Sequence, residues 1–161
     1  MAKKLVKDGK KILMTRRAER TEDMTVKEST MGDTNDRPIG YWNCETEKTH
    51  PVILAKIPVK HPWEIFTYLP FGGWNDCPDT AAHTAVAKYW YETDRAVPAV
   101  LTYDTLEYRV PTPVAPEHAA ARAVEQYAYC SDIIEQGTPG MSISRLADGL
   151  RKSHIWYFWW D

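Results

Sequence analysis

The aromatic residues are unevenly distributed along the chain. All 19 of them (7 Trp, 9 Tyr and 3 Phe) lie between Tyr41 and Trp160, and residues 1–40 contain none. Large aromatic side chains dominate the energetics of protein cores, so we expect the folded body to begin near Tyr41. Residues 21–37 are polar and poor in bulky side chains, which indicates a linker. The sequence therefore predicts an N-terminal arm and linker over residues 1–37 and a single domain over residues 38–161.

The arm is basic and the body is acidic. Residues 1–20 carry eight Lys or Arg against Asp8 and Glu19, whereas from Ile39 onward ten Lys or Arg face fifteen Asp or Glu. A hairpin over residues 4–14 is predicted from the Asp8-Gly9 pair, because Asp-Gly favours a two-residue turn. The arm could bind phosphate or the acidic face of a sister subunit, or it could be a solvated tail.

Composition favours an ordinary globular protein. Of the 161 residues, 43% are apolar and 26% are charged, and no apolar run approaches the length of a membrane span. We see no signal peptide, and three widely spaced cysteines argue against a disulfide scaffold. The expected location is therefore the cytoplasm, and no membrane contact is predicted.

Hydrophobic periodicity divides the body into alternating strands and helices. The predicted strands cover residues 52–59, 97–103, 106–110 and 154–160, and the predicted helices begin near residues 62, 79, 116 and 142. The last strand is apolar on both faces, which favours a central position. The order βαββαβ predicts an α+β fold with a four-stranded mixed, ferredoxin-like sheet and helices on one face. Another mixed α+β sheet remains open, because element order does not determine which strands are adjacent.

Three motifs stand out: GGWNDCP at 72–78, QYAYCSDIIEQG at 126–137 and IWYFWWD at 155–161. Together they resemble the bacterial and phage family catalogued as domain of unknown function 4253, over about residues 50–161. The family usually reads Cys-Pro-Asp in the second motif, whereas this chain has Cys130-Ser131-Asp132. The resemblance implies no activity, so it supports the domain boundary and the place of a site but not a reaction.

The same motifs contain the candidate binding residues. Gly72 and Gly73 give backbone freedom just before a helix start, which attracts anions. A second polar cluster follows the helix that begins near residue 116. The structural alternative is that these side chains cap helices and satisfy free backbone groups. We predict that the two clusters meet near the C-terminal strand and form a binding site of Trp74, Asn75, Asp76, Asp132, Gln136 and Asp161.

The cysteine and histidine pattern does not predict catalysis. Cys77 precedes a helix start, where a thiol pKa is lowered, and His83 follows six residues later. No third group that would orient such a pair is evident from the sequence. The spacing of the cysteines and histidines matches no standard zinc site. We therefore predict no metal, no cofactor and no catalytic residue.

Two classes of function remain open, and the sequence does not decide whether the protein is an enzyme. In the preferred class it is a non-catalytic binding protein of the bacterial or phage inhibitor or immunity type, which occupies a partner protein or a second copy through an acidic, aromatic-rich surface. In the alternative it is a small enzyme or nucleotide-binding protein with a cleft between the Gly72–Asn75 loop and the 132–136 turn. An acidic body opposes nucleic acid, which only the basic arm could contact.

Overall fold

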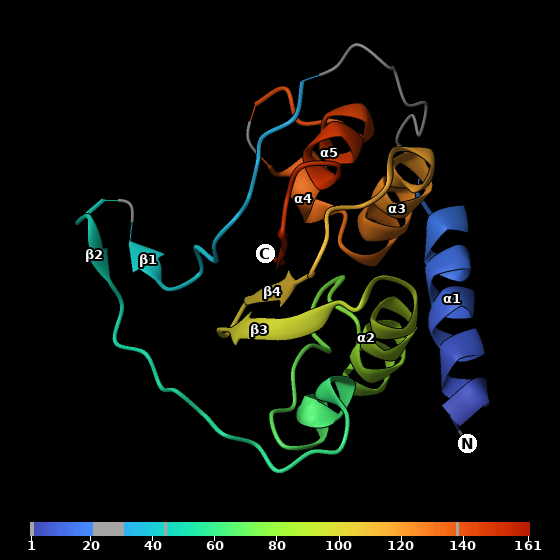
Figure 1. Cartoon of the computed structure of the whole chain (residues 1–161), viewed down its shortest axis with the longest axis vertical. Helices are drawn as coiled ribbons and strands as arrows, with labels where there is room; N and C mark the ends of the chain where they lie inside the picture. Colours follow the sequence, from blue (N-terminus) through green and yellow to red (C-terminus); the bar gives the residue numbers. More distant parts are fainter. Residues whose placement is uncertain (1, 21–30, 44, 138) are drawn as a thin grey trace.

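The computed structural model describes residues 2–20, 31–43, 45–137 and 139–161, and it has an α+β architecture (Figure 1). The helices are α1 (Ala2–Ala18), the 3-10 helix η1 (Pro62–Thr67), α2 (Thr80–Asp94), α3 (Pro116–Tyr129), α4 (Asp132–Glu135) and α5 (Ile143–Leu150). The strands are β1 (Trp42–Asn43), β2 (Lys48–Thr49), β3 (Val97–Leu101), β4 (Thr105–Arg109) and β5 (Ile155–Trp159). In the described part of the chain, no helix has the length and apolar character needed to cross a bilayer.

The main sheet has three antiparallel strands in the order β3-β4-β5, and β1 and β2 form a separate small hairpin. The predicted four-stranded mixed, ferredoxin-like sheet is therefore wrong. The central strand is β4, which pairs with β3 on one side and with β5 on the other. The prediction of a central C-terminal strand is also wrong, because β5 lies at the sheet edge.

Backbone segments from the N-terminal part of the chain explain why β5 is buried despite its edge position. The N–H groups of His154 and Ile155 both donate to Asn35 O at 2.9 Å. On β4, the buried carboxylate of Glu107 accepts the N–H groups of Ile39 at 2.9 Å and Gly40 at 3.0 Å. The chain near residues 35–40 thus covers the sheet in place of a fourth strand.

The predicted strand at 52–59 is the largest error of the sequence analysis. These residues form neither helix nor strand, and Val52, Ile53 and Leu54 are 68%, 93% and 100% exposed. In Figure 1 this segment runs along the lower left, away from the helices. Apolar, β-branched composition predicted burial, but among the described residues no strand pairs with this segment.

The core lies under one face of β5. Trp156, Phe158 and Trp160 are buried, whereas Tyr157 and Trp159 on the other face are only half-buried. The ring of Trp90 on α2 stacks on Phe158 at 5.4 Å and meets Trp156 edge-on at 5.5 Å. Buried and half-buried aromatic residues thus alternate along this strand, and the buried rings join α2 to the sheet.

Local signals located the starts of α2, α3 and α5 correctly. Asp79 caps α2 by accepting the N–H of Ala82 at 2.8 Å, and Ser142 caps α5 by accepting the N–H of Arg145 at 3.2 Å. α3 begins at Pro116, as a helix start with proline in its first turn predicts. The turn expected at 132–136 contains the short helix α4.

The N-terminal arm is a helix, so the predicted hairpin is wrong. Gly9, expected in a turn, lies where α1 crosses α2, and a Cβ there would come within 2.3 Å of Ala85 O. Leu13, one helical turn later, is buried in the main core. The packing of Gly9 and Leu13, one helical turn apart, therefore outweighs the local preference of Asp8-Gly9 for a turn. Residues 21–30 of the predicted linker lie outside the described residues, and the domain boundary near residue 38 remains a prediction.

Candidate functional site

The two predicted polar clusters are linked through Asp161. Asn75, in left-handed backbone conformation (φ 44°), donates from Nδ2 to the backbone oxygen of Asp161 at 2.5 Å. The Asp161 N–H donates to Asp132 Oδ2 at 3.1 Å, and Gln136 Nε2 donates to Asp132 Oδ1 at 3.2 Å. Asp132 itself is buried. The structure thus brings Asn75, Asp132, Gln136 and Asp161 together, and both carboxylate oxygens of Asp132 accept hydrogen bonds within this cluster.

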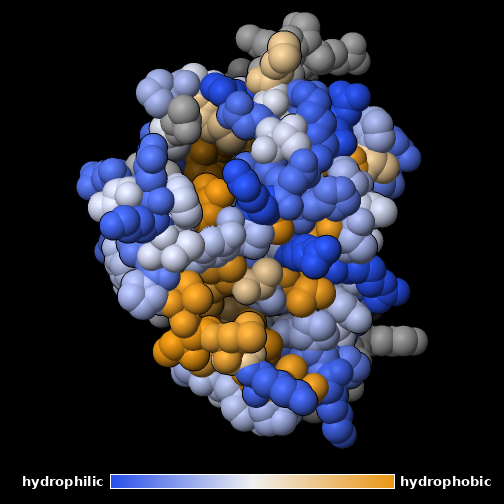
Figure 2. Space-filling model, turned by 60° about the vertical axis from the view of Figure 1, so that its left-hand side comes forward, coloured by the Kyte–Doolittle hydropathy of each residue, from blue (hydrophilic) through white to orange (hydrophobic). Residues whose placement is uncertain are grey.

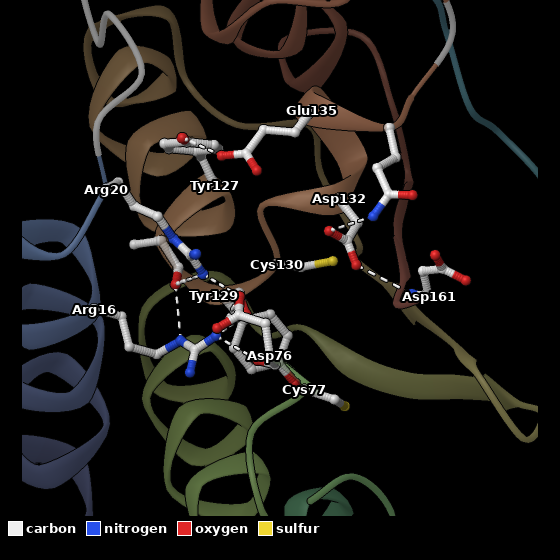
Figure 3. Close-up of polar contacts among 12 residues, drawn as sticks. Arg16, Arg20, Asp76, Cys77, Tyr127, Tyr129, Cys130, Asp132, Glu135 and Asp161 are labelled. Atoms are coloured by element: carbon white, nitrogen blue, oxygen red, sulfur yellow. Dashed lines mark hydrogen bonds and ion pairs between the residues drawn. The ribbon is translucent and has the colours of Figure 1, made fainter. Parts of the chain in front are cut away.

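Asp76 belongs to a different group of charges. Its carboxylate pairs with Arg16, at 3.0 Å from Nη2, and with Arg20. Arg16 Nε also donates to Ala128 O at 2.9 Å, at the C-terminal end of α3. Figure 3 shows this group on one side of Cys130, with Asp132 and Asp161 on the other. Cationic side chains stabilise the free carbonyl groups of a helix C-terminus, so these two arginines cap α3.

Trp74 contributes packing to the same region. Its ring is half-buried and meets Phe71 edge-on with centroids 5.2 Å apart. Phe71 in turn contacts Trp160 at 5.7 Å. Trp74 therefore extends the aromatic core toward the loop that carries Asn75 and Asp76.

Cys77 and His83, which the sequence analysis set aside, are in contact. Cys77 Sγ lies 3.5 Å from His83 Nε2, and His83 Nδ1 is hydrogen-bonded to the hydroxyl of Tyr129. Gly72 makes this arrangement possible, since it has φ 85° and a Cβ there would meet Pro78 O at 1.8 Å and His83 Nε2 at 2.5 Å. Tyr129 is the third group that the sequence analysis did not find.

The electrostatics of this triad do not favour nucleophilic catalysis. Burial raises the pKa of the Cys77 thiol to about 12 and lowers the pKa of His83 to about 3. Burial also raises the pKa of Tyr129 well above its ordinary value. All three groups are therefore neutral near pH 7, whereas a catalytic cysteine requires the thiolate. The arrangement fits a hydrogen-bonded part of the core.

Within the ranges that the structure describes, no group of three or more His, Cys, Asp or Glu side chains is placed to hold a metal ion. Cys77 and Cys130 are both free and buried. Cys130 Sγ donates to Trp159 O at 2.9 Å, which ties the end of α3 to β5.

The part of the chain that contains Asn75, Asp132 and Asp161 matches a known protein family. A family model described as "Domain of unknown function (DUF4253)" matches residues 53–161. The chain belongs to this family. No curated protein and no solved structure matches it.

The DUF4253 region includes the Asp161 cluster and the Cys77–His83–Tyr129 contact, whereas α1 precedes it. Arg16 and Arg20 nevertheless bind the DUF4253 region at Asp76 and Ala128. Arg16 lies in the last turn of α1 and Arg20 lies just beyond its end, and both contact Asp76. The summed positive charge of residues 1–20 does not distinguish these two arginines from the other basic residues of the arm.

Two further buried polar groups were missed. Gln126 on α3 and Trp156 on β5 are each 1% exposed. The side-chain N–H groups of both residues lack a hydrogen-bond partner. A glutamine four residues after Arg122, on the buried face of a helix, was the available signal for the first. Nothing in the sequence distinguishes the indole of Trp156 from the other core tryptophans.

Proposed function

We propose that this protein is a non-catalytic binding protein of the inhibitor or immunity type, which occupies a partner protein through the apolar segment 51–59 and the neighbouring Trp42. The observation that carries the proposal is the exposure of three consecutive apolar side chains, Val52, Ile53 and Leu54. Figure 2, which brings the left-hand side of Figure 1 forward, shows apolar residues gathered in the lower part of this face. Contiguous exposed apolar surface of this kind is typical of interaction sites.

The backbone of the segment supports the same proposal. Within the described chain, the residues from 51 to 59 make one backbone–backbone hydrogen bond, from the Val59 N–H to Ile57 O at 2.9 Å. The other N–H and C=O groups are thus available for pairing. An extended segment with β-branched side chains and unpaired backbone groups can add as a strand to the sheet edge of another protein.

The proposed contact surface consists of aliphatic side chains more than aromatic ones. Four of the seven tryptophans are buried, and Trp42 alone is in the exposed class. The acidic charge of the body remains a factor in steering toward a basic partner. The neutral Cys77–His83 pair and the buried Asp132, whose two carboxylate oxygens are already hydrogen-bonded, also favour binding over catalysis.

The test uses a double variant of the full chain, Ile53→Asp with Leu54→Asp. A photo-reactive amino acid at position 52 first captures the partner, which is then purified and titrated against the wild type and the variant. We expect the double variant to bind at least tenfold more weakly with an unchanged melting temperature. Met31→Asp is the matched control, because Met31 is also apolar and 84% exposed, and it should bind as the wild type does.

Sedimentation velocity on the same proteins identifies the kind of partner. A concentration-dependent dimer that is absent in the double variant makes the partner a second copy of this chain. A monomer in all three proteins makes it a different protein. The proposal fails if the double variant binds its captured partner as tightly as the wild type, or if Met31→Asp weakens binding equally.

A further inference from the structure

A cavity of about 380 Å³ lies along the outer edge of β5. The chain near residues 33–39, the end of α3, α4 and α5 enclose it on its other sides. Its apolar walls include Ile133, Leu146 and Leu150, and Trp159 of β5 adds an aromatic surface. This volume is in the range of pockets that hold small organic molecules, and the cavity is separate from the segment 51–59.

Three residues that line the cavity have a buried side-chain N–H without a partner: Gln126 (Nε2), Trp156 (Nε1) and Arg145 (Nε). Gln126 Nε2 and Trp156 Nε1 belong to side chains that are each 1% exposed, and both residues line the cavity. Buried polar groups in folded proteins are almost always hydrogen-bonded, so each exception calls for an explanation. Trp160 Nε1 also lacks a partner, but it does not border this cavity. An acceptor in the cavity would satisfy the first two donors.

The charges at the cavity rim are already paired. Arg145 Nη2 donates to Asp33 Oδ2 at 2.9 Å, and both oxygens of Asp132 accept hydrogen bonds from Asp161 and Gln136. Two carboxylates and one guanidinium leave the rim net negative, which disfavours an anionic ligand. The groups left to recognise a ligand are therefore the neutral donors of Gln126 and Trp156, together with the Nε of the Arg145 guanidinium whose charge Asp33 already pairs.

We propose that this cavity binds a small uncharged molecule with an apolar, ring-containing body and carbonyl oxygens or ring nitrogens as acceptors. Gln126 Nε2 and Trp156 Nε1 donate to these acceptors, and the walls of α4, α5 and β5 enclose the body. The combination of predominantly apolar walls and a few fixed polar groups is typical of small-molecule sites. This site is independent of the proposed protein contact.

The test is a titration of the isotope-labelled full chain with uncharged lactams and lactones of one and two rings, 2-quinolinone among them. Nuclear magnetic resonance follows the indole N–H of Trp156 and the side-chain amide of Gln126. We expect saturable shifts of both signals, while the indole signal of the exposed Trp42 stays in place. Naphthalene, which matches 2-quinolinone in shape but has no acceptor, should bind about tenfold more weakly. The anion 2-naphthoate should also bind more weakly.

A variant of Gln126 tests whether hydrogen bonding contributes to ligand binding beyond simple filling of the cavity. Gln126→Leu keeps the side-chain size and removes the donor, so we expect at least fivefold weaker binding of 2-quinolinone and unchanged binding of naphthalene. The wild-type titration stands even if this variant does not fold. The proposal is overturned if no lactam or lactone shifts the two signals, if naphthalene binds as well as 2-quinolinone, or if Gln126→Leu binds as the wild type does.

Discussion

Residues 52–59 and residues 155–160 are both apolar runs with a high content of strand-forming side chains, and the two have opposite environments. Trp156, Phe158 and Trp160 are at most 1% exposed, whereas Leu54 is fully exposed. The second run pairs with β4 and packs its rings against Trp90. Within the described residues, the first run pairs with no strand, and its side chains at positions 52–54 are exposed.

The difference shows that an apolar composition favours burial of a segment but does not specify which surface will bury it. For residues 155–160, that surface belongs to the same chain, because α2 and α3 supply a matching aromatic face. For residues 52–59, the side chains of Val52, Ile53 and Leu54 stay exposed in the described part of the chain. We therefore interpret the first run as an interaction segment and the second as the centre of the core.

The largest expected effect comes from removing residues 155–161. This deletion should abolish cooperative folding, because it removes several buried aromatic side chains worth roughly 2–3 kcal/mol each. Thermal unfolding followed by near-ultraviolet circular dichroism measures the effect. Replacing residues 52–57 with a Gly/Ser sequence of equal length is the control and should leave a cooperative transition. A deletion variant that still melts cooperatively would contradict the assignment of the core.

Acid should destabilise the aromatic core through His83, whose ring lies 5.5 Å from Trp160. Its pKa is lowered from 6.5 to about 3 in the folded state by burial, so between these values the unfolded state binds the additional proton. The free energy of unfolding should therefore fall as the pH drops from about 6.5 to about 3, by on the order of 5 kcal/mol.

The measurement is urea unfolding at a series of pH values. In His83→Gln, which cannot take up this proton, the contribution to the pH dependence should disappear whatever the absolute stability of the variant. An unchanged slope between pH 6.5 and pH 3 in His83→Gln would show that the imidazole is not the group responsible.

Leu13 tests whether α1 belongs to the buried region. Leu13→Ala should lower the free energy of unfolding by about 2–5 kcal/mol, since Leu13 is buried in the core cluster. Its neighbour Met14 is 64% exposed, and Met14→Ala should change stability by no more than about 0.5 kcal/mol. Equal, small effects would instead support a body that folds independently from residue 38 onward.

The end of β5 should depend on Asp132. Asp132→Ala removes the acceptor for the Asp161 N–H and for Gln136, so we expect a loss of about 1–3 kcal/mol in chemical denaturation. Asp36 is exposed, and Asp36→Ala is the matched control with little expected effect. A stable Asp132→Ala protein with altered ligand binding would favour a binding role for this carboxylate over a structural one.

The smallest effect on stability is expected in the segment 52–59. The double variant Ile53→Asp with Leu54→Asp should unfold within about 0.5 kcal/mol of the wild type, because both side chains are already in solvent. Ile155→Asp, which places the same charge in the buried run, should be severely destabilised. Comparable losses in the two proteins would show that residues 52–59 are buried in solution.

The sequence predicted the elements better than their assembly. Helix starts at Asp79, Pro116 and Ser142 were identifiable because capping and proline preferences act within a few residues. The pairing of β4 with β5, the docking of Gly9 on α2 and the burial of Glu107 depend on residues far apart in the chain. No local pattern contains that information.

The candidate site shows the same division. The meeting of Asn75 with Asp161 and of Asp161 with Asp132 was expected from three separate motifs. The arginine cap on α3 and the cavity beside Gln126 were not, since both arise from the way α1, α3 and α5 pack. Whether the six predicted residues bind a ligand remains a prediction.

The contacts of Arg16 with Ala128 and of Asn35 with Ile155 have a consequence for the speed of folding. They join residues 112 and 120 positions apart, and neither can form until the chain has closed a long loop. Proteins dominated by such distant pairings fold slowly, on the scale of roughly milliseconds to seconds. The helices α2 and α3 can form early from local interactions, whereas attachment of α1 and closure of the sheet edge should be late steps that limit the folding rate.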